Sequence, residues 1–568
     1  MSFKRNFILI SIFALLSIST ICALKLYEKI KPSTEKMDLY NYYKMGSTST
    51  DTAALIIQDE IASENVIIDN NVMYLEKGIL YDYISTCFYW NSDTNQLIVT
   101  TPNEYITVDY QSLDYFSNSE KQSMDSIIMK QVDGKTYVSI PFVEMFANIE
   151  YAFYDNPNRL VLKCKWGEEF TMATVSSSSE LRYDASAQTD ILSTPKAGAK
   201  LIILEESCGS DKDYTKVATE DGLIGYIKSN ALNASYTEIL TNNYEGYNYQ
   251  LDRLDYVSMG WYNVAGKSGN SYVSDFIKGR TGMNVISPTW FAVSDTEGGI
   301  RSFASEDFVT TCHNAGLEVW PTVNDFDYEK VSLLEVIKDN NKRKILIDNL
   351  VNETVKFKCN GINVDFEHIT EESSPYYIQF LREITVACHQ KDLILSVDSY
   401  VPVSYRAQYK LDEQAEFVDY VVIMAYDEYG EGSPKAGPTS SIKWVKTAVD
   451  KTLTQVPKHK IVIGIPFFMR YWKLNSSGVV STSAMSMSDG IATLKNAGVV
   501  AGWDESTGQY FAEYSSGGYT HKIWLESASS VKSKLEYIMS KDVAGAAYWR
   551  LGYEDVDEVW EVISQFLK

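Results

Sequence analysis

Residues 360–367 read Asn-Gly-Ile-Asn-Val-Asp-Phe-Glu, and this stretch decides the fold of the C-terminal half of the chain. Side chains alternate along a strand, so Asn363, Asp365 and Glu367 share one face while the apolar residues between them take the other. A strand buried on both sides is normally apolar throughout. Three polar residues on one face need water, a partner or a ligand. The sequence therefore predicts a chemically active strand end.

The two carboxyl groups of this stretch suggest acid–base chemistry. Residues two apart on a strand lie about 7 Å apart on the same face. Like charges at that separation, with partial burial, should raise the pKa of one carboxyl toward neutrality. We expect this effect to keep a proton on Glu367 for donation to a leaving group. The side chain of Asp365 can rotate or can share a proton with Glu367.

The region around this strand, from about residue 245 to 568, alternates strand-like apolar runs with helical patterns. This alternation is typical of βα units on a parallel sheet. Eight runs in about 320 residues predict a (β/α)₈ TIM barrel, whose chemistry lies at the C-terminal strand ends. The runs are Tyr256–Tyr262, Asn284–Phe291, Leu317–Asn324, Gly361–Glu367, Leu393–Tyr400, Tyr420–Tyr426, Ile461–Phe468 and Ala544–Leu551.

The gap between the seventh and eighth runs is about 75 residues, more than one helix requires. It contains the alternating segment 509–514, Gln-Tyr-Phe-Ala-Glu-Tyr. The sequence predicts a small hairpin insertion before the last barrel strand.

The overall composition limits the partners. The chain has 568 residues and a formal net charge of −24, which disfavours nucleic acid and anionic lipid because phosphate binding uses clustered Lys and Arg. Its 40 Tyr, 22 Phe and 11 Trp suit a neutral substrate that can be stacked upon, such as a sugar. Seven Cys without a CxxC pair or Cys/His metal spacing, and only five His, disfavour a zinc site. Buried free thiols or one or two disulfides both fit the scattered Cys.

The N-terminus predicts export. Lys4 and Arg5 precede an apolar run over residues 7–24, long enough to span a thin bilayer. Basic residues ahead of the run favour a cytoplasmic N-terminus and an exported body. The bulky Ile21 makes a poor cleavage or lipid-attachment pattern, so residues 1–30 are interpreted first as an uncleaved membrane anchor and second as a signal peptide. Residues 31–60 are polar and are predicted to be a linker.

Two modules are predicted before the barrel. Residues 61–165 contain two similar segments, each a strand, a short helix and a hairpin, and they resemble the copper amine oxidase N-terminal-like domain; without any His they offer no copper site. Residues 168–236 are strand-rich with a predicted hairpin turn at 221–222, and they resemble bacterial Src-homology-3-type domains. The second resemblance implies a small all-β barrel. Wall-binding and spacer roles both stay open for these modules.

The octapeptide resembles the DGxDxDxE signature of glycoside hydrolase family 18, the chitinase-like enzymes. Three further strand ends agree with this family: 424–427 (Met-Ala-Tyr-Asp), 464–470 (Gly-Ile-Pro-Phe-Phe-Met-Arg) and 548–550 (Tyr-Trp-Arg). Together with the two upstream modules, the chain looks most like the bacterial cell-wall and spore-cortex branch of the family. The first two Asp of the signature are Asn360 and Asn363 here. Asn363 can hydrogen-bond to Asp365 but cannot ionise, which implies a shifted pH profile.

The resemblance implies retaining hydrolysis assisted by the substrate, with no metal or organic cofactor needed. The 2-acetamido oxygen of the sugar attacks the anomeric carbon while Glu367 protonates the glycosidic oxygen. Asp365 orients the acetamide and stabilises its developing positive charge, and Tyr426 hydrogen-bonds to the acetamide oxygen. The resemblance also assigns Asn363 and Asp427 to the sugar site, with Trp549 stacking under the sugar. Met424 is interpreted as packing. Trp290 and Asn324, at the ends of strands two and three, are further expected sugar contacts.

The leading hypothesis is a surface-held or secreted, wall-associated β-N-acetylglucosaminidase acting outside the cytoplasm. Its substrate would be peptidoglycan or a related polysaccharide that contains N-acetylglucosamine, with chitin, vegetative wall and spore cortex all open. One alternative is a non-catalytic protein that binds the wall or chitin, and another is a structural link between membrane and wall. The sequence predicts no oligomeric state and does not choose between exo and endo cleavage.

Overall fold

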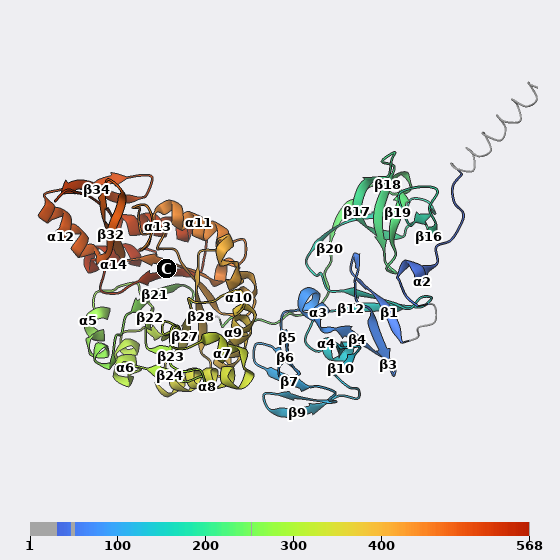
Figure 1. Cartoon of the computed structure of the whole chain (residues 1–568), viewed down its shortest axis with the longest axis horizontal. Coiled ribbons are helices and arrows are strands. Elements are labelled where there is room, and N and C mark those ends of the chain that lie inside the picture. Colours follow the sequence, from blue (N-terminus) through green and yellow to red (C-terminus); the bar gives the residue numbers. More distant parts are fainter. Residues whose placement is uncertain (1–30, 47–50, 252, 567–568) are drawn as a thin grey trace, which may run out of the picture. The chain divides into compact units, whose positions relative to one another are not determined.

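The computed structural model describes residues 31–46, 51–251 and 253–566, which form two compact units (Figure 1). The first unit takes residues 31–99 and 106–246, and the second takes 247–566 together with 100–105. The predicted anchor, residues 1–30, lies outside the described residues. Within them, no helix has both the length and the apolar character needed to cross a membrane.

The first unit begins with a mixed sheet in the order β10-β11-β4-β3-β1-β13-β12, with β2 attached to β1. The short helix α2 (Leu39–Tyr42) precedes it. The strands are β1 (Thr52–Ile57), β2 (Glu60–Ile61), β3 (Val66–Asp69), β4 (Val72–Glu76), β10 (Met129–Val132), β11 (Lys135–Ser139), β12 (Glu150–Tyr154) and β13 (Arg159–Lys163).

The two similar segments predicted in this unit have the expected local structure. In the first, β4 runs into the helical turns α3 (Lys77–Ile79) and η1 (Leu80–Ile84), followed by a hairpin. In the second, β11 runs into α4 (Ile140–Val143), followed by the hairpin β12–β13. The two hairpins belong to different sheets. The second hairpin is part of the mixed sheet, and the first hairpin begins a separate antiparallel sheet. That sheet contains β5 (Phe88–Asn91), β6 (Gln96–Thr100), β7 (Tyr105–Asp109), β8 (Asp114–Ser117) and β9 (Glu120–Ser123).

Part of the segment predicted to be a linker is instead a central strand. Within residues 31–60, β1 pairs with β13 and β3, and all but its first residue are buried. Ala53, Leu55 and Ile57 pack into one hydrophobic core, while Ala54 and Ile56 pack into another. The linker prediction is wrong over this stretch because the polar residues around the strand conceal an apolar run that two cores share.

The strand-rich segment that follows forms an antiparallel sheet in the order β16-β15-β19-β18-β17-β14-β20. The predicted turn joins β18 to β19, with Gly222 at φ +87°. The sheet is β-rich as predicted, and its likeness to Src-homology-3-type domains stays a prediction. Its elements are β14 (Glu169–Thr174), β15 (Leu181–Arg182), β16 (Ile191–Ser193), β17 (Lys200–Cys208), β18 (Tyr214–Thr219), β19 (Ile224–Lys228), η2 (Ser229–Ala231) and β20 (Tyr236–Ile239).

In the second unit, all eight predicted strand runs are strands, and consecutive ones pair in parallel. They are β21 (Val257–Tyr262), β22 (Val285–Pro288) with β23 (Phe291–Val293), β25 (Glu318–Val319) with β26 (Thr322–Asn324), β27 (Gly361–Asp365), β28 (Ile394–Tyr400), β29 (Tyr420–Met424), β30 (Ile461–Pro466) and β36 (Gly545–Trp549).

The hydrogen-bonded ladder is not one continuous ring. The third run is interrupted at Trp320 and Pro321, since β25 pairs with β22 while β26 pairs with β23 and β27. Proline lacks the N–H that a ladder needs, which accounts for a break at this point. A side strand, β24 (Ile300–Ser302), extends the sheet from β23.

Helices cover the outside of this sheet (Figure 1). Along each strand, alternate residues enter different cores: Val421 and Ile423 of β29 pack outward against helices, whereas Tyr420 and Val422 pack inward. The helical elements are η3 (Lys267–Tyr272), α5 (Val273–Ile277), α6 (Glu306–Asn314), α7 (Leu333–Lys338), α8 (Asn340–Lys356), α9 (Ser374–His389), η4 (Ser404–Tyr409), α10 (Leu411–Phe417), α11 (Ile442–Thr452), η5 (Lys458–Lys460), α13 (Ala528–Ser540) and α14 (Val556–Ser564).

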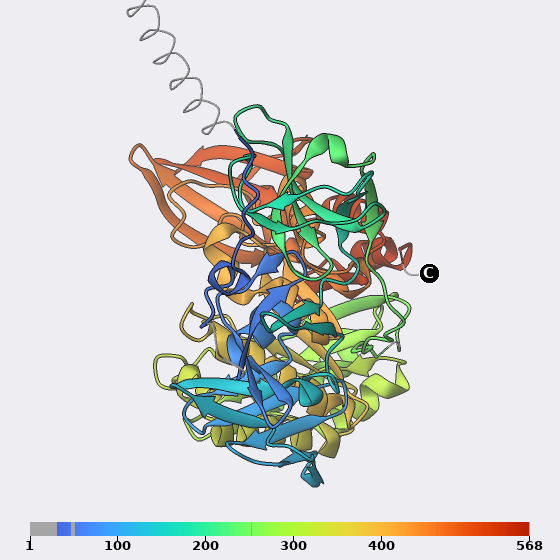
Figure 2. The ribbon, with the colours of Figure 1, turned by 90° about the vertical axis from the view of Figure 1, so that its right-hand side faces the viewer.

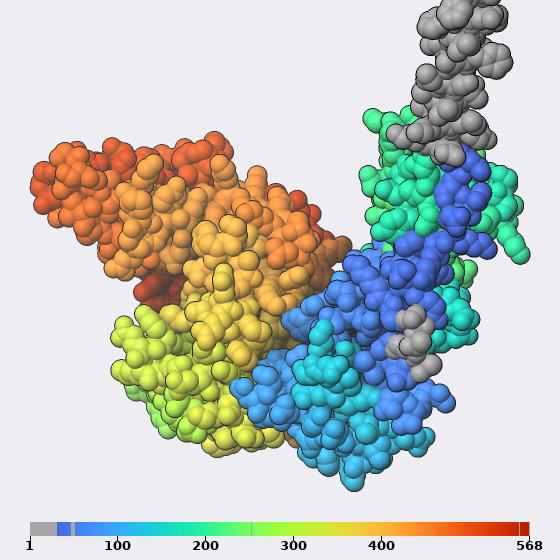
Figure 3. Space-filling model, turned by 45° about the vertical axis from the view of Figure 1, so that its right-hand side comes forward, coloured from blue at the N-terminus to red at the C-terminus, as the bar shows by residue number. Residues whose placement is uncertain are grey.

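The insertion predicted before the last strand is present. Its strands pair in the order β32-β31-β35-β34-β33, and the predicted alternating segment lies in β34. It projects from the barrel as an orange-red lobe in Figures 2 and 3. Its elements are β31 (Phe468–Asn475), β32 (Gly478–Ser486), α12 (Met487–Ala497), β33 (Gly502–Asp504), β34 (Gln509–Ser516) and β35 (Tyr519–Leu525).

The junction of β36 with β21 gives a test of barrel stability. A Cβ atom on Gly545 would lie 1.9 Å from the carbonyl oxygen of Val257, a backbone atom that cannot rotate away. We expect Gly545→Ala to lower the free energy of unfolding by about 1–3 kcal/mol through overpacking. Gly502→Ala is the matched control, because its Cβ would meet nothing within 4 Å. Thermal unfolding of both variants checks this, and equal transition temperatures would contradict it.

Candidate active site

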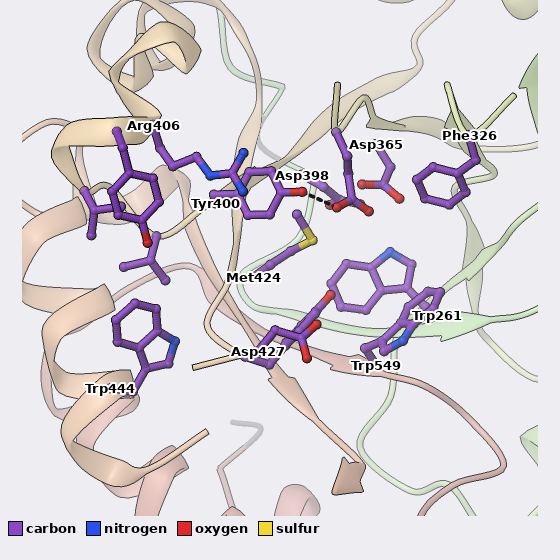
Figure 4. A pocket seen from close by; sticks show the side chains of 15 residues that line it. Trp261, Phe326, Asp365, Asp398, Tyr400, Arg406, Met424, Asp427, Trp444 and Trp549 are labelled. Carbon is purple, nitrogen blue, oxygen red and sulfur yellow. Dashed lines mark hydrogen bonds between the residues drawn. The ribbon is translucent and has the colours of Figure 1, made fainter. Parts of the chain in front are cut away.

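A pocket of about 270 Å³ lies at the C-terminal ends of the barrel strands (Figure 4). Carboxyl groups from three different segments and several aromatic rings face it. The lining residues are Trp261, Phe326, Asp365, Glu367, Asp398, Tyr400, Val401, Val403, Tyr405, Arg406, Met424, Tyr426, Asp427, Trp444 and Trp549.

Asp365 ends β27 and is 8% exposed. Its Oδ1 atom is buried and has no hydrogen-bond partner within the described part of the chain. Burial raises the pKa of Asp365 well above its usual range, and the nearby charges of Asp398 and Glu367 raise it further. An unpaired buried carboxyl oxygen costs stability unless a ligand satisfies it. This oxygen is therefore available to a hydrogen-bond donor in the pocket.

Glu367 lies two residues past Asp365 and also lines the pocket. Burial is the largest cause of the raised pKa of Glu367, and the charge of Asp325 adds to it. The hydroxyl of Tyr400 donates a hydrogen bond to Oε2 of Glu367, which acts in the opposite direction (Figure 4). The pKa is raised as the sequence predicts, but the expected cause differs: burial dominates, and the main like charge comes from Asp325 rather than Asp365.

Asp325 fixes the segment that carries Glu367. One of its carboxylate oxygens accepts the backbone N–H of Glu367 at 3.0 Å, and the other accepts the N–H of His368 at 3.1 Å. The Nδ1 atom of His368 lies 3.1 Å from the same carboxylate. A single buried carboxylate from the loop after β26 thus positions the backbone of the acid. The sequence analysis does not single out this residue.

Asn363 lies beneath the pocket, with no exposed surface, and holds a different partner from the one predicted. Its Nδ2 donates to Oδ1 of Asp398 at 2.9 Å and to Oγ of Ser396 at 3.0 Å, and its Oδ1 accepts from Nε1 of Trp261 at 3.1 Å. Because these groups engage its amide, Asn363 holds the carboxylate of Asp398 on β28 and not that of Asp365.

Asp398 is the main site residue that the sequence analysis misses. It is 2% exposed, and burial raises the pKa of its carboxyl well above its usual range while the hydrogen bond from Asn363 lowers it. A signal for it was present: Ser396, Asp398 and Tyr400 alternate along a strand run with the same period of two as the polar residues of β27. A second polar strand face beside the first would have indicated it.

The end of β29 supplies Met424, Tyr426 and Asp427, which line the pocket together as predicted. Burial raises the pKa of Tyr426 well above its usual range, so its hydroxyl stays protonated and able to donate. Asp427 has a positive φ of +54° and accepts a hydrogen bond at 3.2 Å from Nη2 of Arg470. Met424 is largely buried and reaches the middle of the pocket in Figure 4.

Trp549, at the end of β36, lines the pocket as predicted. Its ring meets that of Trp261 edge-on, with ring centres 5.8 Å apart and planes at 69°. This contact orients the indole of Trp549 within the pocket. Trp261, on β21, joins the site through both this ring contact and its hydrogen bond to Asn363.

Two predicted sugar contacts do not line the pocket. Trp290 is 1% exposed, packs against Phe308 and donates from Nε1 to Asn270 at 2.8 Å, so it is a core residue. Asn324, at the end of β26, is also buried, and its side-chain oxygen accepts the backbone N–H of Phe326. Both residues were expected to contact the sugar because they lie at strand ends. Their side chains are instead enclosed by protein.

The geometry brings together groups suited to proton transfer and to binding a polar ring. A buried carboxyl with a raised pKa is suited to donate a proton. An aromatic ring, a phenol hydroxyl and an unpaired carboxyl oxygen in the same cavity can hold a sugar and its substituents. Among the described residues, no group of three or more His, Cys, Asp or Glu is arranged to hold a metal ion.

Comparison with known proteins agrees with this arrangement. The uncharacterized glycosylase YvbX of Bacillus subtilis is 23% identical over 307 residues, which cover 51% of this chain and 87% of that protein. The cortical fragment-lytic enzyme of Bacillus subtilis is 27% identical over 226 residues, which cover 38% of this chain but only 52% of that protein. The chain thus spans about half the length of the curated cortical fragment-lytic enzymes that it matches.

Among solved structures, the spore cortex-lytic enzyme SleL of Bacillus cereus matches with a TM-score of 0.50 and 18% identity, covering 57% of this chain and 76% of that one. At this identity the likeness supports the TIM-barrel fold alone. The model for "Glycosyl hydrolases family 18" matches residues 223–554, more than half of the chain. The barrel, its acidic strand ends and this match together establish that the chain belongs to glycosyl hydrolases family 18 and is a glycoside hydrolase.

Proposed function

We propose that this protein hydrolyses β-1,4-linked N-acetylglucosamine bonds in peptidoglycan, or in a chitin-like glycan, with retention of configuration and assistance from the substrate. One observation carries the proposal: Glu367, whose pKa is raised by burial, lines the same pocket as Asp365, whose Oδ1 has no partner within the described residues. A donor that fits beside it is the N–H of a 2-acetamido group. The relatives' names, which refer to cortical fragments and chitin, support a glycan that contains N-acetylglucosamine.

The first chemical step breaks the glycosidic bond. The acetamido oxygen attacks the anomeric carbon, the bond from that carbon to the glycosidic oxygen breaks, and this oxygen takes the proton of Glu367. The product is a cyclic oxazolinium ion bound to the enzyme, together with a released alcohol. In the second step a water attacks the same carbon and returns a proton to Glu367, which restores the acetamide and the original configuration.

The neighbouring side chains stabilise the charge that develops. Oδ1 of Asp365 accepts the acetamide N–H, which aligns the acetamido oxygen for attack and offsets the positive charge on the nitrogen. The protonated hydroxyl of Tyr426 donates to the acetamido oxygen. Trp549 stacks under the sugar and Asp427 borders it, while Met424 fills space beside the ring. Asn363 acts from below, through its hydrogen bond to Asp398.

The upstream segments fit a protein that acts outside the cytoplasm. We propose that residues 1–30 direct export, as an anchor or a signal peptide, and that the modules at 61–165 and 168–236 hold the enzyme at the wall. The names of the cortex-lytic relatives support action on cell-wall material. Removal of residues 51–246, which takes β1 away together with the sheet it belongs to, tests the module roles through loss of binding to insoluble wall, with residues 1–30 left in place.

The first prediction tests the proton donor. Glu367→Gln keeps the shape and the hydrogen-bonding capacity of the side chain but carries no transferable proton, so kcat should fall about 10²–10⁴-fold. The measurement is release of reducing ends from purified peptidoglycan and from chitin oligosaccharides. Mass spectrometry of the products should place the new reducing ends on N-acetylglucosamine. Equal, negligible release by wild type and variant, or ends on N-acetylmuramic acid, would contradict the proposal.

The second prediction concerns the pH profile. Glu367 must be protonated to act, so activity should fall as pH rises through its raised pKa. The hydrogen bond from Tyr400 lowers this pKa and the charge of Asp325 raises it. Tyr400→Phe should therefore move the basic limb of kcat/KM to higher pH, and Asp325→Asn should move it to lower pH. Shifts in the same direction for both variants would be inconsistent with Glu367 as the titrating acid.

The third prediction uses the pair of Asn363 and Asp398. Asp398→Asn removes a like charge beside Asp365 and should lower the pKa of that carboxyl, since the charge of Asp398 raises it. It also leaves two amides facing each other, and we expect kcat to fall about tenfold or more. The exchanged double variant, Asn363→Asp with Asp398→Asn, restores one carboxylate and one amide across the same contact and should recover part of the loss. A double variant no better than Asp398→Asn would show that the pair is not exchangeable.

A further inference from the structure

The pocket holds a cation whose role the reaction leaves unassigned. Arg406, in η4, is the one Lys or Arg among the residues that line the pocket, which also include Asp365, Glu367, Asp398 and Asp427. Within the described residues its side chain makes neither a salt bridge nor a hydrogen bond, and it contacts the rings of Tyr400 and Tyr405. By contrast, the nearby Arg470 is already engaged by Asp427.

The guanidinium of Arg406 is held by stacking rather than by charge. Its central carbon lies 3.8 Å from the ring centre of Tyr400 and 5.9 Å from that of Tyr405. Stacking covers the flat face of the guanidinium and leaves the N–H groups along its edge free. A planar fork of N–H donors fixed in this way is suited to bind a carboxylate through two parallel hydrogen bonds.

The position of Arg406 relates it to the bond that is cleaved. Tyr400 contacts both groups: its ring carries Arg406 and its hydroxyl donates to Glu367. Glu367 protonates the glycosidic oxygen in the proposed reaction, so Arg406 lies one side chain away from that oxygen. In Figure 4, Arg406 at the upper left and Trp549 at the lower right occupy opposite edges of the pocket. The sugar over Trp549 is the one attacked, which places Arg406 near the sugar that leaves.

The half-buried guanidinium of Arg406 is more weakly hydrated than an ammonium group, so an anionic ligand can pair with it at a small desolvation cost. A neutral sugar polymer offers only hydroxyl and amide groups, which bind a guanidinium less strongly than an anion does. Asp427 is compensated by Arg470.

We propose that Arg406 binds a carboxylate carried by the sugar on the leaving side of the cleaved bond, so that the site favours an anionic glycan over a neutral one. This inference rests on the proposed function. Chitin has no such group. In peptidoglycan the carboxylate belongs either to the lactyl ether of N-acetylmuramic acid or to the peptide attached to it. The lactyl carboxylate is free only where that peptide has been removed, so in this case an amide hydrolysis supplies the substrate.

The test compares matched substrates. Peptide-free glycan strands with free lactyl carboxylates, the same strands after amidation, and peptide-bearing strands are each given to wild type, Arg406→Gln and Arg406→Lys. We expect wild type to show a kcat/KM for a carboxylate-bearing strand roughly tenfold above that for the amidated strand. Arg406→Gln should abolish this ratio and Arg406→Lys should retain part of it. Preference for the peptide-free or the peptide-bearing strand identifies which carboxylate is bound.

The controls separate this inference from the proposed function. Lys344→Gln removes the same unit of charge from an exposed position of the barrel unit and should leave the substrate ratio unchanged. A wild-type ratio near one would overturn the role of Arg406 while leaving the hydrolase activity intact. If no glycan strand is cleaved, the proposed function fails. The carboxylate contact is then tested separately, by calorimetry of the binding of the acidic glycan strand to Glu367→Gln with and without Arg406→Gln. Equal affinities for the acidic strand would then overturn it.

Discussion

Burial of carboxyl groups at the ends of two adjacent parallel strands is the constraint on which the site depends. Asp365 and Asp398 are almost wholly enclosed, and Glu367, two residues after Asp365, lines the same pocket. Burial limits the hydration of the charged forms, so the pKa of each of these carboxyls is raised. The acid of a glycoside hydrolase needs this property, because it must carry a proton at a pH where ordinary carboxyls are ionised.

The barrel produces this burial through strand alignment. β27 and β28 pair in parallel with Asn363 opposite Ser396, so the polar faces of the two strands coincide inside the barrel. The intervening residues Ile362 and Val364 pack outward into the core between strands and helices. Two rows of polar side chains therefore meet in a space otherwise lined by apolar and aromatic residues. A register shift of one residue in either strand would turn the polar row of that strand into the outer core, so the same packing that stabilises the barrel selects the catalytic arrangement.

Local pattern was sufficient for much of the fold and part of the site. The eight strand runs, the insertion and the order of hairpins in the first unit follow from apolar periodicity and turn residues, which act over a few positions. The linker prediction failed at β1, because only its pairing with β13 reveals that it is central. Asp325 and Asp398 escaped for the same reason: each contacts a residue distant in sequence, and no short motif records that contact. Arg406 escaped because its place in the pocket depends on how the fold assembles the strand ends. Trp290 and Asn324 were expected at the pocket because strand ends were equated with exposure, whereas enclosure depends on the packing of later loops.

The contact between Asn363 and Asp398 changes how the family signature is interpreted. An Asn in place of the middle Asp removes one ionisable group from β27, and by sequence alone this is a loss. In space the amide faces the carboxylate of Asp398, with 2.9 Å between Nδ2 and Oδ1, so a carboxylate remains beside Asp365 but comes from the next strand. The electrostatic field at Asp365 depends on where a charge lies and not on which strand supplies it. A departure from a linear motif is therefore evidence of lost chemistry only when no neighbouring strand places an equivalent group at the same point.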